Sequence, residues 1–82
     1  MELDIWDDFL TIEFGDNAPF PYKKAHVKGE TFDDGFVMYA SSPRWVKPVE
    51  EGVCESQKAK LFQCIINEGK KQDYKIEIDM RA

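Results

Sequence analysis

Apolar and polar residues alternate along several stretches of the chain with the period of two that is typical of β-strands. In the first stretch, residues 9–14, Leu10, Ile12 and Phe14 share one face. The cleanest alternation lies near the other end, over residues 74–80, where the inward-facing set is Tyr74, Ile76, Ile78 and Met80. Both stretches predict half-buried strands.

Two further strands are predicted between them, joined by a tight turn. Residues 22–32 are a weaker candidate, and residues 36–40 are apolar on both faces, which suits a central strand covered by a helix. Between them stand Asp33, Asp34 and Gly35, which are typical of hairpin turns because Asp and Gly tolerate positive φ.

Residues 55–68 are predicted to form an amphipathic helix. Its apolar stripe consists of Leu61, Phe62, Ile65 and Ile66. Gln57 stands three residues after Cys54, where a capping box would place it, and Gly69 is a typical residue to follow the last helical turn.

The predicted order is therefore β-β-β-α-β in a single domain of residues 1–82. The predicted fold class is α+β: one mostly antiparallel four-stranded sheet with a single helix packed on one face. If the last strand lies beside residues 36–40, the crossover through the helix makes that pair parallel. Residues 41–53 are expected to be an irregular link. The other face of the sheet is expected to be open or covered by an acidic N-terminal arm, residues 1–8.

Charge is distributed unevenly along the 82 residues. Residues 1–34 carry nine acidic and three basic side chains, whereas residues 35–82 carry seven and eight, for a net charge of −5. A net-negative surface repels phosphate, which disfavours direct nucleic-acid binding, and attracts a basic partner. The alternative interpretation is that the charge merely keeps a small protein soluble.

The cysteines and the N-terminus bear on where the protein works. Cys54 and Cys64 lie ten residues apart, which is neither a zinc spacing nor a redox pair. The N-terminus is acidic where a signal peptide would be basic, and no run approaches the roughly 18 apolar residues of a membrane span. We therefore expect a cytoplasmic protein that does not bind a membrane.

Candidate chemistry is sparse, so we expect no enzyme, no metal and no cofactor. His26 is the only histidine and is expected to point outward from its strand. Cys54 is expected to be a structural thiol. Glu30, Asp33 and Asp34 supply too few oxygen ligands for a calcium loop, and no phosphate-binding glycine motif is present.

The two tryptophans each admit two interpretations. Trp45 either packs the 41–53 link onto the sheet or, with Arg44, forms an exposed anchor for a partner. Trp6 either closes the core together with Ile5 and Phe9 or belongs to an acidic, aromatic patch that faces a basic protein.

A pattern covering a little over half of the chain resembles a known family. It consists of the strand Phe36-Val37-Met38-Tyr39, then Ser41, Trp45, Pro48 and Gly52, the helix around residues 61–66, and Lys75-Ile76-Glu77-Ile78. It resembles the small immunity proteins of bacterial polymorphic toxin systems, in particular the immunity protein family numbered seventy-four.

The resemblance implies a non-enzymatic inhibitor that binds and occludes a cognate toxin domain in the cytoplasm. Many such toxins are nucleases with basic clefts, which an acidic surface can occupy. The predicted partner-binding residues are Asp4, Trp6, Asp7, Asp8, Glu30, Asp33 and Asp34, with Arg44 and Trp45 as an alternative anchor. We expect a monomer in the free state. The alternatives are a phage-encoded inhibitor of a host defence nuclease, a general protein-interaction module, or a small enzyme that uses His26 or Cys54.

Overall fold

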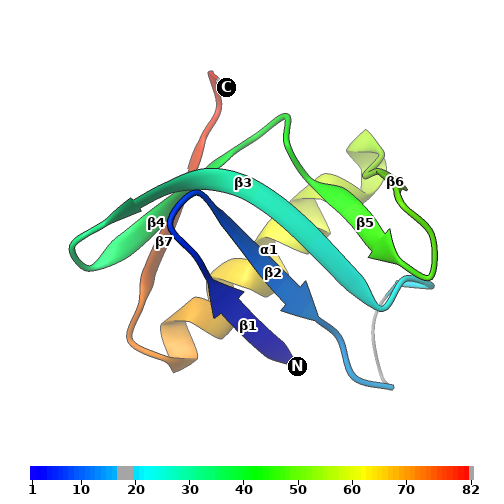
Figure 1. Cartoon of the computed structure of the whole chain (residues 1–82), viewed down its shortest axis with the longest axis horizontal. Coiled ribbons are helices and arrows are strands. Elements are labelled where there is room, and N and C mark those ends of the chain that lie inside the picture. The colour runs from blue at the N-terminus through cyan, green and yellow to red at the C-terminus, as the bar shows by residue number, and fades with distance from the viewer. Residues whose placement is uncertain (17–19, 82) are drawn as a thin grey trace.

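The computed structural model describes residues 1–16 and 20–81, and within them it contains one helix and seven strands (Figure 1). In chain order these are β1 (Glu2–Ile5), β2 (Phe9–Glu13), β3 (Lys24–Phe32), β4 (Gly35–Tyr39), β5 (Arg44–Lys47), β6 (Glu51–Gly52), α1 (Glu55–Lys71) and β7 (Lys75–Asp79). The α+β class is as predicted, but the sheet has seven strands rather than four.

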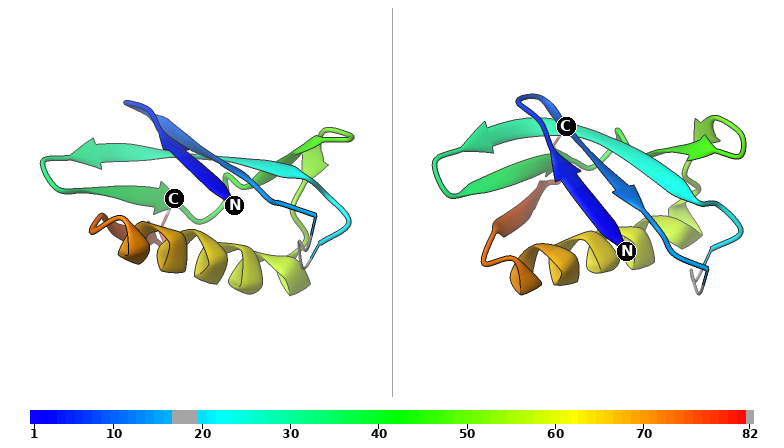
Figure 2. Two further views of the ribbon diagram at one scale, coloured as in Figure 1. Left: turned by 90° about the horizontal axis from the view of Figure 1, so that it is seen from below. Right: turned by 60° about the horizontal axis from the view of Figure 1, so that its bottom comes forward.

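The strands run in the order β1-β2-β3-β4-β7, with β5 paired to β3 and β6 paired to β5. The pair β4–β7, joined through α1, is parallel, and the other pairs are antiparallel. The last strand does lie beside β4, and the crossover through the helix makes that pair parallel, as expected for this arrangement. The helix lies on one side of the curved sheet and leaves the other side bare (Figure 2).

The three additional strands come from the expected N-terminal arm and from the link that was expected to be irregular. The N-terminal arm is the edge strand β1, in which Leu3 pairs with Ile12 of β2. It therefore extends the sheet and does not cover its open face. The link over residues 41–53 contains β5 and β6, because pairing with β3 places Trp45 opposite Ala25 and buries its ring.

The nine-residue strand β3 is shared by three neighbours. It pairs with β2 along one edge, while β5 and then β4 share its other edge. Where β5 gives way to β4, the Lys28 N–H donates to Ser42 Oγ at 3.0 Å, and the Ser42 hydroxyl donates to the Tyr39 carbonyl at 2.7 Å. The next residue, Gly29, has no room for a side chain, because a Cβ would strike the carbonyl oxygen of Val37.

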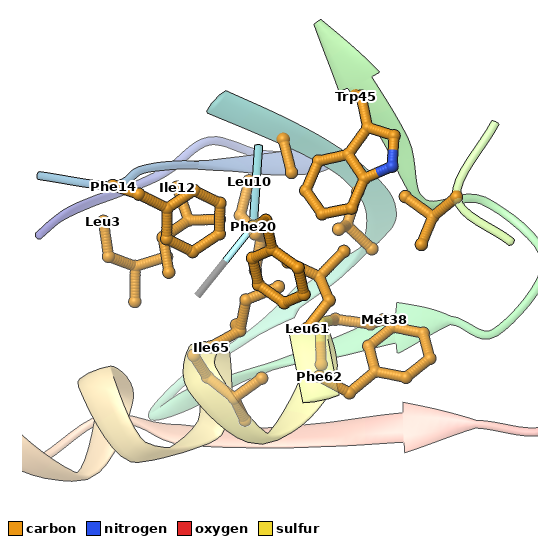
Figure 3. Close-up of a cluster of buried hydrophobic side chains, with 14 of the residues drawn as sticks. Leu3, Leu10, Ile12, Phe14, Phe20, Met38, Trp45, Leu61, Phe62 and Ile65 are labelled. Atoms are coloured by element: carbon orange, nitrogen blue, oxygen red, sulfur yellow. The ribbon is translucent and has the colours of Figure 1, made fainter. Parts of the chain in front are cut away.

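The core between sheet and helix includes the fully buried side chain of Trp45, which lies at one end of the cluster (Figure 3). Its ring stacks on Tyr22 with centroids 4.5 Å apart and lies 5.0 Å from Phe20, which in turn lies 5.3 Å from Phe14. The helix contributes the stripe that the sequence predicted: Leu61 and Ile65 are fully buried, Phe62 is buried and Ile66 is half-buried. Burying this much aromatic surface favours the folded state strongly.

Both ends of α1 differ from the prediction. Cys54 is the N-cap, but no side-chain capping hydrogen bond forms, so there is no capping box. The helix continues through Gly69 to Lys71. Gly69 packs closely there, since a Cβ would lie 2.7 Å from Ile76 Cδ1 and 3.0 Å from the Tyr74 carbonyl oxygen.

The chain leaves the helix at Asp73, which has a left-handed backbone with φ of 56°. The Tyr74 N–H donates to the Gly69 carbonyl at 2.8 Å and the Asp73 N–H to the Lys70 carbonyl at 3.2 Å. These bonds form a Schellman motif, with Asp73 in the position that glycine usually holds.

Two other predictions need correction. The turn at Asp33 and Asp34 joins β3 to β4, but neither these residues nor Gly35 has a positive φ. Gly35 is needed instead because a Cβ would strike the carbonyl oxygen of Lys75. Met80, expected to face inward, is 77% exposed, because β7 ends at Asp79 and the helix does not cover it.

The crowding at Gly29 predicts a selective effect of added methyl groups. Gly29→Ala should lower the free energy of unfolding by about 2–3 kcal/mol, the usual cost of overpacking. Gly52→Ala is the matched control, because a Cβ at Gly52 meets nothing within 4 Å. Urea unfolding of both variants measures the difference, and equal effects would contradict the packing at the β3 junction.

Candidate functional site

The sheet face that points away from α1 is called here the open face. Residues directly opposite each other in an antiparallel pair share a face, so the register identifies its members. Leu10 pairs with Val27, and both side chains are fully buried on the face of the sheet that the helix covers. The alternate pairs, Phe9 with Lys28 and Thr11 with His26, therefore lie on the open face.

Acidic and aromatic side chains from three segments gather at one end of this sheet. We call this region the acidic end; it consists of Trp6, Asp7, Asp8, Glu30, Phe32, Asp33 and Asp34. The segments are the β1–β2 turn, the second half of β3 and the β3–β4 turn. The β1–β2 turn contacts residues 29–31 of β3, and the β3–β4 turn begins directly after residue 32. The three segments therefore lie close together at this end of β3.

Backbone and side-chain hydrogen bonds hold the β1–β2 turn in place. The Trp6 N–H donates to the Phe9 carbonyl at 2.8 Å and closes the turn. The Gly29 N–H donates to the Asp8 carbonyl at 3.0 Å. The Thr31 hydroxyl lies 2.8 Å from the carbonyl oxygens of both Trp6 and Asp7. The turn is thus anchored to the strand at two points, which reduces the entropy lost when a partner binds.

The carboxylates of the acidic end are exposed and lack compensating cations. All ion pairs among residues 1–16 and 20–81 lie within residues 55–81 and include none of these acids. Trp6 and Phe32 are each 53% exposed beside them. Glu30 alone has a side-chain partner, the Tyr39 hydroxyl, which donates to it at 2.9 Å and whose pKa is raised by this bond.

Three rings form a row that leads from the acidic end onto the open face. The rings of Trp6 and Phe9 stack with centroids 5.7 Å apart, and those of Phe9 and His26 with centroids 4.6 Å apart. Trp6 therefore does not close the core. Its half-exposed ring lies among the acidic side chains, as in the second of the two interpretations given for it above. The side chains that close the core at this edge are the buried Leu3 and the half-buried Ile5.

Positive charge gathers at the other end of the row, around His26. Partial burial lowers the pKa of His26 below its ordinary value. The charges of Lys28, Arg44 and Lys24 lower this pKa further, while Asp8 raises it. The open face is thus acidic at one end and basic at the other.

The remaining predicted residues do not all join the acidic end. Asp4 lies on the open face of β1, opposite Thr11. Arg44 is exposed and pairs with His26 in the basic region. Trp45, the next residue along the strand, points to the opposite face and is only 1% exposed. Arg44 and Trp45 therefore cannot act together as a surface anchor, and Trp45 is the packing residue.

The sequence analysis did not identify Phe32 as part of the acidic end or Thr31 as the residue that anchors the β1–β2 turn. Phe32 has the same strand parity as Glu30 and directly precedes Asp33, so the alternation alone would have placed it on the open face. Thr31 carried no such signal, because its role depends on a turn 24 residues earlier in the chain.

Other reactive groups lie apart from this surface. Cys54 Sγ lies 3.1 Å from the Ser56 hydroxyl, a contact that lowers the pKa of the thiol, whereas burial raises the pKa of Cys64. Both cysteines are free. The described part of the chain contains no cluster of three or more metal-ligating side chains. None of its helices is long and apolar enough to cross a membrane.

Comparison of the chain with protein-family models, curated proteins and solved structures gives no match. The resemblance to the immunity proteins therefore rests on its motif residues. Several of these build the core: Phe36, Met38, Trp45, Leu61 and Ile65 are all buried. The motif thus describes how the chain packs and does not locate a binding surface.

The lowered pKa of His26 predicts a loss of stability in acid. A folded-state pKa below the ordinary 6.5 means that the unfolded chain binds the proton more readily. The free energy of unfolding should therefore fall as the pH drops through 6.5. His26→Phe keeps the stack on Phe9 but cannot titrate, so this acid-side loss should be smaller than in the unaltered protein. Urea unfolding between about pH 7.5 and 5.5 measures it, and equal losses would refute the assignment.

Proposed function

We propose that this protein is a non-enzymatic inhibitor, of the immunity-protein kind, that binds and occludes a basic surface of a toxin domain. The observation that carries the proposal is the acidic end. There, uncompensated carboxylates from three segments surround two half-exposed aromatic rings. Such a surface suits a basic protein partner, because the charges attract it and the rings supply contact area.

The geometry favours a protein partner over a small molecule. The groove beside the acidic end, about 470 Å³, is shallow and is lined by Leu3, Ile5, Trp6 and Thr31 among others. The acids themselves project from turns and from the open face. Projecting charges and rings insert into a partner's cleft more readily than they enclose a ligand.

Charge also orients the encounter. A basic partner is attracted to Asp7, Asp8, Asp33 and Asp34 and repelled by the basic region around His26. This asymmetry favours docking at the end of the sheet over docking across the whole open face.

Capture of the partner from the native host, followed by mass spectrometry, provides the first test. The proposal expects a protein with a basic, toxic domain to co-purify, and expects this chain to abolish that domain's toxicity when the two are mixed. Recovery of a substrate that the chain converts to product would overturn the proposal.

Once the partner is known, paired acid substitutions separate local charge from net charge. Asp7→Asn with Asp8→Asn should slow association roughly tenfold at low salt and flatten its dependence on ionic strength. Glu50→Gln with Glu51→Gln removes the same net charge from another exposed part of the surface. In stopped-flow experiments, the association rate constant of this control should stay within about twofold of that of the unaltered chain. Equal slowing by both pairs would exclude a specific acidic end.

Trp6 should contribute chiefly to the lifetime of the complex. Trp6→Ala is expected to raise the dissociation rate about 30-fold, the effect of a central aromatic contact worth about 2 kcal/mol. The matched control is Val49→Ala, since Val49 is 54% exposed elsewhere on the surface. Surface plasmon resonance measures both, with thermal melts to show that the variants remain folded. Unchanged dissociation of the Trp6 variant would remove this ring from the interface.

A further inference from the structure

Strand β7 lies at the edge of the sheet, with β4 on one side only. The Lys75 N–H donates to the Asp34 carbonyl at 3.3 Å, and the Asp79 carbonyl accepts from the Ala40 N–H at 3.1 Å. Backbone groups alternate in direction along a strand, so those of Ile76 and Ile78 point away from β4. Within residues 1–16 and 20–81, these N–H and C=O groups have no hydrogen-bond partner.

The seam between this free edge and α1 contains apolar side chains flanked by charged ones, Lys58 at the first of two hollows and Lys70 and Asp73 at the second. One hollow, about 570 Å³, is lined by Phe62, Ile66, Ile78 and Met80 among others, and a second, about 330 Å³, by Ile66, Tyr74 and Ile76 among others. Met80 is 77% exposed beside the first hollow. An unpaired edge with exposed apolar side chains beside it is a surface that proteins normally cover.

We propose that β7 pairs antiparallel with β7 of a second copy of this chain, about a two-fold axis through Glu77. In this register Ile76 lies opposite the partner's Ile78, and Ile78 opposite the partner's Ile76. Each of these pairs exchanges two backbone hydrogen bonds, so all of the free groups of both residues are satisfied.

The charges of β7 are complementary to themselves in this register. Lys75 lies opposite the partner's Asp79, and Asp79 opposite the partner's Lys75, which makes two pairs of opposite charge on the exposed face. These pairs replace or share the exposed pairs that Lys75 makes with Glu77 at 3.4 Å and Asp79 with Arg81 at 3.5 Å within each copy. The sequence around Glu77 thus selects a second copy as the occupant of the edge. The one unfavourable pair is Glu77 with its own equivalent on the axis.

The two neighbouring registers are less favourable. A pairing centred on Ile76 would place Ile78 opposite the partner's Tyr74. Because the Tyr74 N–H already donates to the Gly69 carbonyl at 2.8 Å, the Ile78 carbonyl would be left without a donor in both copies. A pairing centred on Ile78 would place Glu77 opposite the partner's Asp79 and would repel at both positions.

The apolar residues follow the same register. Met80 comes to lie opposite the partner's Tyr74, which lines the smaller hollow. A flexible thioether packs well against an aromatic ring, so the most exposed apolar side chain of this edge becomes covered. The sequence alone favoured a monomer because it did not reveal that β7 is an edge strand. The pairing does not depend on the proposed function, since it uses the outer edge of β7, and the acidic end includes no residue of that strand.

Sedimentation velocity of the full chain, from micromolar concentrations to roughly 1 mM, tests the proposal. We expect a concentration-dependent dimer. Lys75→Asp and Asp79→Lys should each weaken it about tenfold, because each change occurs twice in the dimer, and the double variant should restore it. Lys60→Asp is the control, as Lys60 is exposed on α1 and lines neither hollow.

Glu77→Gln provides a variant that leaves the strand chemically almost unchanged. It removes the repulsion on the axis and should tighten the dimer several-fold. Amide exchange at Ile76 and Ile78 should slow as concentration rises. The proposal would be overturned if the chain stayed monomeric at every concentration, or if the charge reversals left the dissociation constant of the dimer unchanged. It would also be overturned if the edge paired only with a strand of another protein.

Discussion

The arrangement of this molecule depends on the sharing of one strand edge by two neighbours. Along the same side of β3, β5 pairs at one end and β4 at the other, and Ser42 and Gly29 occupy the junction. The hydroxyl of Ser42 satisfies the Lys28 N–H that neither strand reaches. The absence of a side chain at Gly29 lets β4 approach closely. Because β5 pairs at this edge of β3, Trp45 lies opposite Ala25 and its side chain is buried.

The same strand supports the candidate site. Gly29 and Thr31 anchor the β1–β2 turn through their backbone and hydroxyl groups, while Glu30, between them, points to the open face. The acidic end is therefore built on the best-supported strand of the sheet. A partner that binds there meets carboxylates whose backbone is already ordered, which limits the entropic cost of association.

Net charge alone describes this surface poorly. The chain carries −5 overall, yet Lys24, Lys28 and Arg44 make one end of the open face basic. The separation of charge, more than its sum, is what gives a docking partner a preferred orientation. Partial burial lowers the pKa of the only histidine, and the neighbouring cations of this basic end lower it further.

Local pattern determined much of the fold. Alternation over β2, β3 and β7 and the apolar stripe of α1 were legible because burial on one face requires them, whatever the rest of the chain does. The acids at residues 7–8, 30 and 33–34 were also identified from the sequence. That they lie together was decided by the register of β1, β2 and β3, which brings residues 24 positions apart into contact.

Only the tertiary structure decided the remaining features. β5 and β6 have too few residues to show a period; β5 forms by pairing with a free edge of β3, and β6 by pairing with β5. Arg44 and Trp45 are neighbours in sequence, which suggested that they form one anchor. Because successive side chains of a strand point to opposite faces, they cannot do so. Gly35 and Gly69 serve close packing against β7, a contact between distant segments that no local pattern encodes. Features that depend on residues close in sequence, such as strand alternation and the helix stripe, were predictable from the sequence. Features that depend on which strand edges and faces come into contact were not.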